Sequence, residues 1–197
     1  MTDVAIVDSG GANLASLQFA LERLGATSIV SNEPEQIRSA PRVLLPGVGA
    51  AGDAMRRLRE SGMDRVIPQL QVPLLGICLG MQLLYEHSNE GDTPCLGVFS
   101  GRIEQLQPSA ARPVPHMGWN TLQSQRADPL LAGIGPEDYV YFVHSFVAPL
   151  TADTAAASNY GESFTAVVTR ANFRGVQFHP ERSARVGARL LKNFLAL

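Results

Sequence analysis

A cysteine framed by two glycines is the feature of this sequence that most limits how the chain can fold. Residues 75–80 read Leu-Gly-Ile-Cys-Leu-Gly within an apolar run that begins at residue 73, and a helical pattern follows. This order is typical of a nucleophile elbow, in which a buried strand turns sharply into a helix and lifts one side chain above the sheet. A side chain two residues before or after the cysteine would collide with neighbouring backbone. The sequence therefore predicts an α/β fold with Cys78 above the carboxyl ends of parallel strands.

The segments around the elbow support that fold. Short apolar runs predict strands at 4–7, 28–30, 43–45 and 73–77, and periodic patterns predict helices at 13–24, 53–59 and 79–87. Alternating buried strands and helices indicate a parallel sheet covered on both faces. Strands without long helices between them are expected at 102–107, 139–147, 155–158, 165–169 and 175–178, before a last helix at 184–197. We predict one domain, residues 1–197, with three layers, a mostly parallel central sheet and an antiparallel extension in the C-terminal half.

Composition excludes several other classes of protein. The 197 residues include 16 Lys and Arg against 18 Asp and Glu, a net charge of −2 that does not favour binding to nucleic acid or to an anionic membrane. The uncharged run at 72–85 is too short to cross a bilayer. Two cysteines are too few for a disulfide scaffold, and no Cys/His spacing is typical of zinc. Because the opening residues lack the basic start of a secretory signal, we expect a cytoplasmic protein, with no metal and no cofactor.

Cys78 is the expected nucleophile. Unpaired N–H groups at the start of the following helix favour a thiolate, and the N–H of Leu79 would point to the same place and could bind an oxyanion. A buried structural cysteine is the alternative interpretation of any lone cysteine in an apolar run. The flanking glycines favour the nucleophile. Cys95 lacks such a context, and we expect it to be incidental.

His179 is the expected base. The histidines available are His87, His116, His144 and His179. Pro180 favours an extended backbone at His179, and residues two apart in an extended segment lie on the same side. Glu181 can therefore accept one imidazole N–H, which leaves the other ring nitrogen to take the proton of Cys78. A hydrogen-bonded strand-end histidine is the alternative for His179 taken alone. His87 is expected to be solvated at a charged helix end.

Three segments together resemble the class I (triad) glutamine amidotransferase family. They are P-G-V-G at 46–49, G-I-C-L-G-M-Q-L-L at 76–84 and V-Q-F-H-P-E at 176–181, which occur in that family's order. The resemblance implies a catalytic triad of Cys78, His179 and Glu181. It implies an oxyanion hole formed by the backbone of Val48, Gly49 and Leu79. It also implies glutamine-binding positions, namely Gln82, Glu90, His144, Ser145 and Phe146.

Four other segments narrow the resemblance to the glutaminase subunits of imidazole glycerol phosphate synthases. These are V-D-S-G-G-A-N-L-A-S-L at 7–17, P-H-M-G-W-N at 115–120, Y-F-V-H-S-F at 141–146 and H-P-E-R-S at 179–183. The resemblance implies that glutamine is hydrolysed through a cysteinyl thioester. The ammonia would pass to a (β/α)₈-barrel cyclase subunit in a heterodimer, which makes imidazole glycerol phosphate and AICAR in histidine biosynthesis. The implied interface residues are Met117, Trp119, Asn120 and Arg182.

Two departures from the family pattern bear on coupling to that partner. The family often opens with Y-G-x-G-N, and here Ser9 replaces the tyrosine and Gly-Ala precedes Asn13. Arg182 stands where lysine is common, and arginine keeps the charge but not the geometry. Met117 and Trp119 could instead pack in the core. Three alternative functions stay open: the glutaminase subunit of pyridoxal 5′-phosphate synthase, a cysteine hydrolase of the same architecture, and a non-catalytic pseudo-amidotransferase.

Overall fold

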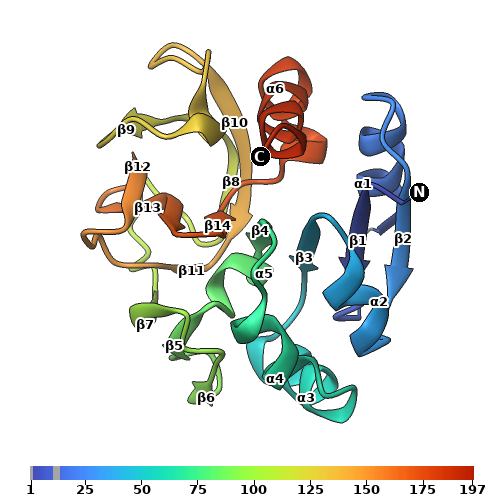
Figure 1. The fold of residues 1–197 in the computed structure, drawn as a ribbon. Helices are drawn as coiled ribbons and strands as arrows, with labels where there is room; N and C mark the ends of the chain where they lie inside the picture. The colour runs from blue at the N-terminus through green and yellow to red at the C-terminus, as the bar shows by residue number, and fades with distance from the viewer. Residues whose placement is uncertain (1, 11–13) are drawn as a thin grey trace.

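The computed structural model describes residues 2–10 and 14–197, and within these ranges eight strands form one central sheet (Figure 1). The strands are β1 (Val4–Val7), β2 (Ser28–Ser31), β3 (Val43–Gly47), β4 (Leu74–Cys78), β9 (Gln123–Ser124), β12 (Thr154–Asn159), β13 (Ser163–Arg170) and β14 (Phe173–Val176). Their order is β2-β1-β3-β4-β14-β13-β12-β9. The first five are parallel to one another, and the last three add antiparallel pairings. The predicted sheet with an antiparallel extension is confirmed.

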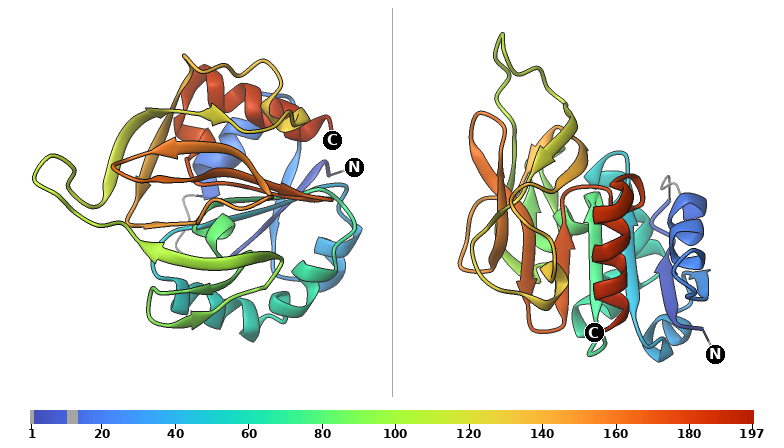
Figure 2. Two further views of the ribbon diagram at one scale, coloured as in Figure 1. Left: turned by 90° about the vertical axis from the view of Figure 1, so that its left-hand side faces the viewer. Right: turned by 90° about the horizontal axis from the view of Figure 1, so that it is seen from above.

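Helices and loops cover both faces of this sheet. The helices are α1 (Leu14–Glu22), α2 (Pro34–Ser39), α3 (Ala51–Glu60), α4 (Met63–Val66), α5 (Leu79–Gln82) and α6 (Ala184–Leu195), with 3-10 turns η1 (Ile67–Gln69), η2 (Pro129–Leu131) and η3 (Pro180–Arg182). Strand β1 shows why two layers are needed. Val4 and Ile6 join one hydrophobic cluster, with α1 and α6, whereas Ala5 and Val7 join the other, with α2 and α3. Alternate residues of a strand face opposite sides, so each face requires its own cover. Figure 2 shows α6 on one side of the sheet and the green segments of the chain on the other.

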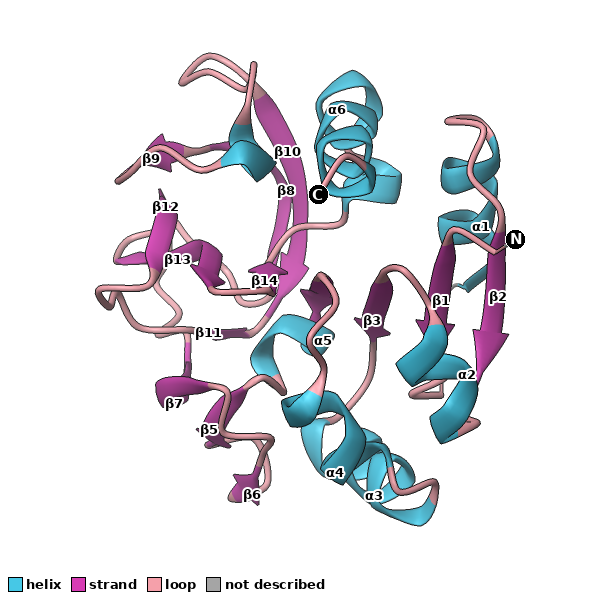
Figure 3. Cartoon of the chain, viewed as in Figure 1, coloured by secondary structure: helices cyan, strands magenta, loops and turns pink. Residues whose placement is uncertain are grey.

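Two smaller sheets lie beside the central one (Figure 3). One has the order β11-β7-β5-β6, formed by β5 (Tyr85–Ser88), β6 (Thr93–Pro94), β7 (Phe99–Gln105) and β11 (Phe146–Val147). The other is an antiparallel ribbon of β8 (His116–Thr121) and β10 (Tyr139–His144). Thus the segment 139–147, expected as one strand, is divided at Ser145 between two sheets. Strand β8 and helix α2 were not predicted.

The helix predicted at 79–87 is wrong beyond its first turn. Helix α5 ends at Gln82, and the chain enters β5 at Tyr85. The carbonyls of Leu83 and Leu84 accept hydrogen bonds from Leu96 and Phe99, so tertiary partners replace the helical ones. Leu83, Leu84 and Tyr85 are all fully buried, and three consecutive buried residues do not fit a helix with one solvated face. The predicted first helix began at Asn13, which lies outside the described residues.

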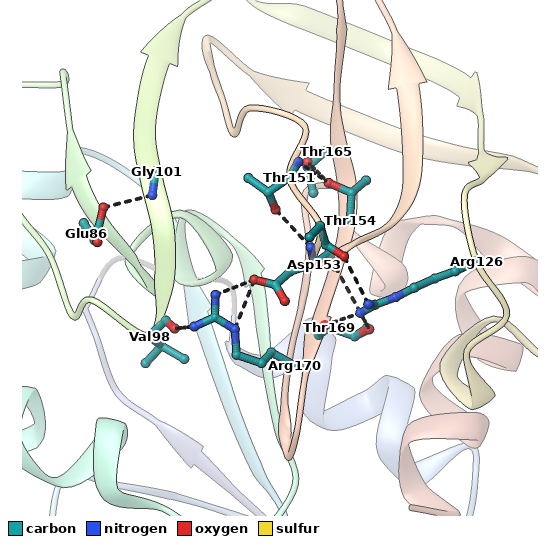
Figure 4. A network of polar contacts seen from close by, with 11 residues as sticks. Glu86, Val98, Gly101, Arg126, Thr151, Asp153, Thr154, Thr165, Thr169 and Arg170 are labelled. Atoms are coloured by element: carbon teal, nitrogen blue, oxygen red, sulfur yellow. Dashed lines mark hydrogen bonds and ion pairs between the residues drawn. The ribbon is translucent and has the colours of Figure 1, made fainter.

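A network of charged and polar groups fixes the base of the β12–β13 hairpin (Figure 4). Arg170 forms an ion pair with Asp153 and donates to the carbonyl of Val98 at 2.7 Å, which joins β13 to the segment before β7. Arg126 donates to the carbonyl of Asp153 at 3.2 Å and also bonds to Thr169. These contacts satisfy backbone groups at the hairpin ends. They hold β13 in place beside β14, the strand that leads into the candidate site.

No helix among the described residues is long and apolar enough to cross a membrane. The single-domain boundary at 1–197 stays a prediction.

Candidate active site

Cys78 lies at a strained turn between β4 and α5. Its backbone has φ 54° and ψ −114°, a conformation that a side-chain-bearing residue rarely adopts. Both flanking glycines are required by close approach. A Cβ at Gly80 would lie 1.7 Å from the carbonyl oxygen of Leu45, and one at Gly76 would lie 2.7 Å from the carbonyl oxygen of Gly80. The predicted elbow geometry is therefore confirmed.

The cysteine opens into a cavity of about 390 Å³ at the carboxyl end of β4. Every residue that was predicted for the triad, the oxyanion hole or glutamine binding lines this cavity: Cys78, His179, Glu181, Val48, Gly49, Leu79, Gln82, Glu90, His144, Ser145 and Phe146. Arg182 lines it too, whereas Met117, Trp119 and Asn120 do not. Segments more than 100 residues apart in the sequence therefore meet at one pocket.

The His179–Glu181 pair is held rigidly. Nδ1 of His179 and Oε1 of Glu181 are 2.8 Å apart, so the carboxylate fixes the orientation of the ring. The backbone N–H of His179 donates to the carbonyl of Tyr141 at 2.9 Å, and the Ser183 hydroxyl donates to the carbonyl of His179 at 2.7 Å. Ser183 is fully buried, and its contribution was not predicted. Nε2 of His179 is buried and has no nitrogen or oxygen partner among the described residues, so it remains available to the Cys78 sulfur.

The electrostatics of this pair favour a charged imidazole. Burial alone would lower the pKa of His179, but interactions with Cys78 and with the Glu181 carboxylate outweigh it and raise the pKa to about 10. The raised pKa of His179 favours the charged form of its ring, next to the Cys78 sulfur. A thiolate nucleophile is stabilised by such a neighbour.

The Val48–Gly49 turn and Glu90 also line the cavity. Gly49 has φ +90°, a region that favours glycine, and open space surrounds the position of a Cβ there. Oε2 of Glu90 accepts a hydrogen bond from the backbone N–H of Ala51 at 2.8 Å, at the start of α3. Ser9, which stands where the family often has tyrosine, is buried and donates to the carbonyl of Pro46 at 2.6 Å. This bond ties the end of β1 to the turn.

Gln177 contacts the nucleophile and was not singled out from the sequence. It is fully buried, and its Nε2 lies 3.7 Å from Sγ of Cys78. Sγ also lies 3.8 Å from the carbonyl oxygen of Val143. The available signal was a lone amide side chain inside the apolar run 175–178, since a buried polar group must find a partner.

His116 and His144 form a buried neutral pair at the wall of the cavity, which His144 lines. Nδ1 of His116 and Nε2 of His144 are 3.0 Å apart, and Nδ1 of His144 lies 2.9 Å from the carbonyl oxygen of Phe146. Burial lowers the pKa of His116 to about 4. Burial, assisted by the charge of His116, lowers the pKa of His144 to about 3.

These two histidines should make stability depend on pH. Their folded-state pKa values lie below the ordinary value of 6.5, so the unfolded chain binds more protons than the folded chain as the pH falls from 6.5 towards 4. We expect the free energy of unfolding to fall in this window by up to about 1.4 kcal/mol per pH unit for each histidine. His179 adds no slope near pH 5, because its raised pKa leaves it protonated in both states. Urea denaturation at about pH 6, 5 and 4.5 measures the effect within this window. An unchanged slope in both His116→Asn and His144→Asn would contradict it.

The outer face of the β8–β10 ribbon is exposed and aromatic. The exposed fractions of Met117 and Trp119 are 63% and 51%, so the alternative that they pack in the core is wrong. The ring centroids of Trp119 and Tyr141 are 5.8 Å apart, and the Arg182 guanidinium lies 4.6 Å from the Tyr141 ring centroid. Because Arg182 also lines the cavity, this ribbon face is continuous with the pocket.

His87 and Cys95 lie away from the pocket lining. His87 is on strand β5 with its side chain 19% exposed and paired with Asp92 at 2.8 Å, so the expected solvated helix end is wrong. The reason is the early end of α5. Among residues 2–10 and 14–197, no group of three or more His, Cys, Asp or Glu side chains is arranged to hold a metal ion.

Fold and pocket together define a class of protein: an α/β sheet with a cysteine at a strand–helix elbow and a histidine–glutamate pair facing the same cavity. Residues 5–197 match the family model "Glutamine amidotransferase class-I". The imidazole glycerol phosphate synthase subunit HisH of Xanthomonas campestris pv. campestris is 54% identical over 197 residues, which are 100% of this chain and 98% of that protein. The protein of the same name from Xanthomonas axonopodis pv. citri is 53% identical over the same shares of the two chains. The chain belongs to the class-I glutamine amidotransferase family, and within it to the HisH subunits of imidazole glycerol phosphate synthase.

Solved structures agree on the fold. The structure of PurLQS from Thermotoga maritima matches 100% of this chain and 99% of its own with a TM-score of 0.73 and 19% identity. Because the chain belongs to this family, the alternative that it is a cysteine hydrolase of another family with the same architecture is excluded.

Proposed function

We propose that this chain is the glutaminase subunit of an imidazole glycerol phosphate synthase, with Cys78, His179 and Glu181 as its catalytic triad. The observation that carries the proposal is that a strained elbow cysteine shares one cavity with a histidine whose Nδ1 lies 2.8 Å from a carboxylate. The names of the full-length relatives support the choice of synthase. A cytoplasmic location stays a prediction from the sequence.

The geometry suits hydrolysis of a side-chain amide. The Cys78 thiolate attacks the amide carbon of glutamine, and the carbonyl π electrons move onto oxygen. The Leu79 N–H and a donor from the Val48–Gly49 turn stabilise that oxyanion. His179 gives its proton to the leaving nitrogen, so the C–N bond breaks and ammonia departs. A γ-glutamyl thioester remains on Cys78. Water then attacks the thioester carbon while His179 accepts a proton of the water; the C–S bond breaks, its electron pair returns to Cys78 as the thiolate, and glutamate leaves.

Substrate recognition is assigned to the polar groups that line the rest of the cavity. Oε2 of Glu90 is occupied by Ala51, and the carboxylate charge remains to attract the α-ammonium group of glutamine. Gln82 uses its amide hydrogens on protein groups, so it would contact substrate only as an acceptor, through Oε1. His144, Ser145 and Phe146 would lie along the bound glutamine.

The proposed partner is a (β/α)₈-barrel cyclase subunit that docks on the exposed ribbon face. Met117 and Trp119 expose apolar surface, and Arg182 stacks on Tyr141 at the rim of the cavity. Aromatic and arginine side chains are the groups that most often carry binding energy at protein interfaces. Docking there would close the mouth of the pocket, so ammonia would pass to the partner without meeting solvent. Asn120, on the same strand, is assigned to this interface too.

Trp119→Ala should weaken binding to the cyclase subunit. We expect the dissociation constant to rise about 30-fold, the effect of losing one aromatic anchor, with unchanged thermal stability of the free chain. Glutamine hydrolysis by the wild-type chain should rise strongly when the cyclase and its nucleotide ligand are added. The measurements are titration calorimetry and glutamate release, with and without the partner. Phe19→Ala, an equally exposed aromatic on α1, is the matched control. Hydrolysis that stays the same with and without the cyclase would refute the assignment to this synthase.

A further inference from the structure

A short chain of buried amides connects the carbonyl of Phe146 to the nucleophile. Nε2 of Gln82 lies 2.9 Å from the Phe146 carbonyl oxygen and 2.9 Å from Oε1 of Gln177. Nε2 of Gln177 lies 3.7 Å from Sγ of Cys78. Gln82 is 5% exposed and Gln177 is fully buried, so water does not compete for these contacts.

The backbone carbonyl fixes the direction of every bond in this chain. A carbonyl oxygen can only accept, so the group of Gln82 that faces Phe146 must be its NH₂. The second hydrogen of that NH₂ is donated to Gln177, so the group of Gln177 that faces Gln82 must be its oxygen. The NH₂ of Gln177 is then turned toward Cys78. The orientation of the distal amide is thus determined by a backbone group two links away.

We propose that Gln177 is a positioning residue that donates a hydrogen bond to the Cys78 sulfur and favours the thiolate, and that Gln82 sets the direction of that bond. This inference rests on the proposed function only in taking Cys78 as the nucleophile. An N–H donor to an anionic acceptor is stronger than one to a neutral acceptor, so the contact stabilises the thiolate more than the thiol. It also fixes the sulfur between β14 and β10.

Gln177 and Gln82 have different roles in this proposal: Gln177 contacts the sulfur, and Gln82 orients Gln177. Gln82 does not touch the sulfur, and a change at Gln82 should still reach it through Gln177. Glutamate at position 82 has at most one hydrogen, which it would give to the Phe146 carbonyl. Its other oxygen would then accept from Gln177, whose amide would turn and present its oxygen to the sulfur. Gln82→Leu removes the hydrogen bond to Gln177 but does not force the Gln177 amide to turn its oxygen toward the sulfur.

Alkylation of Cys78 by iodoacetamide tests the proposal without glutamine or a partner. All variants carry Cys95→Ser, which leaves one thiol to modify. Gln177→Leu should slow alkylation near pH 6 about tenfold, the size of one charge-assisted hydrogen bond, and move the midpoint of the rate against pH upward by about one unit. The rate at high pH should stay unchanged, because every sulfur is then ionised. Gln82→Glu should move the midpoint further than Gln82→Leu.

The charged and titratable groups that line the cavity together with Cys78 are the same in every variant except Gln82→Glu, which adds one carboxyl group. They are His179, Glu181, Arg182, His144 and Glu90. Thr154→Val is the matched control, because it removes a buried hydrogen bond, 2.7 Å to Thr165, in the same sheet but outside the pocket. It should leave the alkylation profile unchanged.

The proposal is overturned if folded Gln177→Leu has the midpoint and low-pH rate of the Cys95→Ser parent. If Gln177→Leu does not fold, equal midpoints for Gln82→Glu and Gln82→Leu overturn it. Failure of the proposed function has a different signature. The parent would then release no glutamate from glutamine with the cyclase present, whatever the alkylation profiles of the variants.

Discussion

Cys78→Ala should abolish glutamine hydrolysis, with a loss of roughly 10⁴-fold or more in kcat, because loss of a triad nucleophile removes the covalent route entirely. The side chain is small and 7% exposed, so the cavity that remains costs little stability beside the catalytic loss. Glutamate release in the presence of the cyclase subunit measures the effect. The variant should still bind the partner, since Cys78 lies inside the pocket and not on the ribbon face.

Cys95→Ala is the matched control for this experiment. Cys95 is a second free cysteine, it does not line the cavity, and burial raises its pKa to about 11. We expect near wild-type hydrolysis from Cys95→Ala. Substantial activity in Cys78→Ala, or equal losses in both variants, would refute the assignment of the nucleophile.

Gly80→Ala should be the most destabilising single-methyl change in the elbow. The new Cβ would lie 1.7 Å from the carbonyl oxygen of Leu45, and that atom belongs to the backbone of β3, so no side-chain rotation relieves the overlap. Either β3 or α5 must move, which separates strands at the centre of the sheet. We expect a loss of about 4 kcal/mol or more, a large part of the stability of an ordinary domain. Urea denaturation monitored by circular dichroism measures it.

Gly52→Ala offers the contrasting control. Gly52 lies in the first turn of α3, and a Cβ there would meet only Oγ1 of Thr93 at 3.5 Å, an ordinary contact. Alanine favours the helix and restricts the unfolded chain, so we expect a gain of about 0.5–1 kcal/mol. If Gly80→Ala is as stable as Gly52→Ala, the close approach of α5 to β3 is wrong.

The elbow and the His179–Glu181 pair were predictable because their geometry is local. Glycine is needed on both sides of Cys78 because a side chain there would collide with backbone of the next few residues or of the adjacent strand. Pro180 constrains the backbone of its neighbour, and Glu181 is only two residues away. The central strands were predictable for a similar reason, since a strand buried on both faces is apolar throughout.

The contact of Gln177 with Cys78 was not predictable, because it depends on the register of two strands. Val176 lies opposite Ile77 in the β14–β4 pairing, and this register places residues that are 99 apart in sequence side by side. Strand β8 was missed because its exposed face is apolar, with Trp119 directed outward and His116 inward. The helix expected beyond Gln82 failed because residues 83–85 take tertiary hydrogen bonds instead.

The two buried polar chains that meet at Phe146 cannot conduct protons to each other. His144 and Gln82 both donate to the same carbonyl oxygen, so the hydrogens on either side point toward it. Proton hopping requires each link to donate in the same direction, and a chain that runs head to head at an acceptor has no such path. A proton change at His116 or His144 therefore cannot travel to the nucleophile by this route. The shared carbonyl can instead transmit movement. A shift of the backbone at Phe146 would displace both sets of hydrogen-bonded side chains together. The hydrogen bonds at Phe146 therefore couple the positions of the two chains but not their protonation.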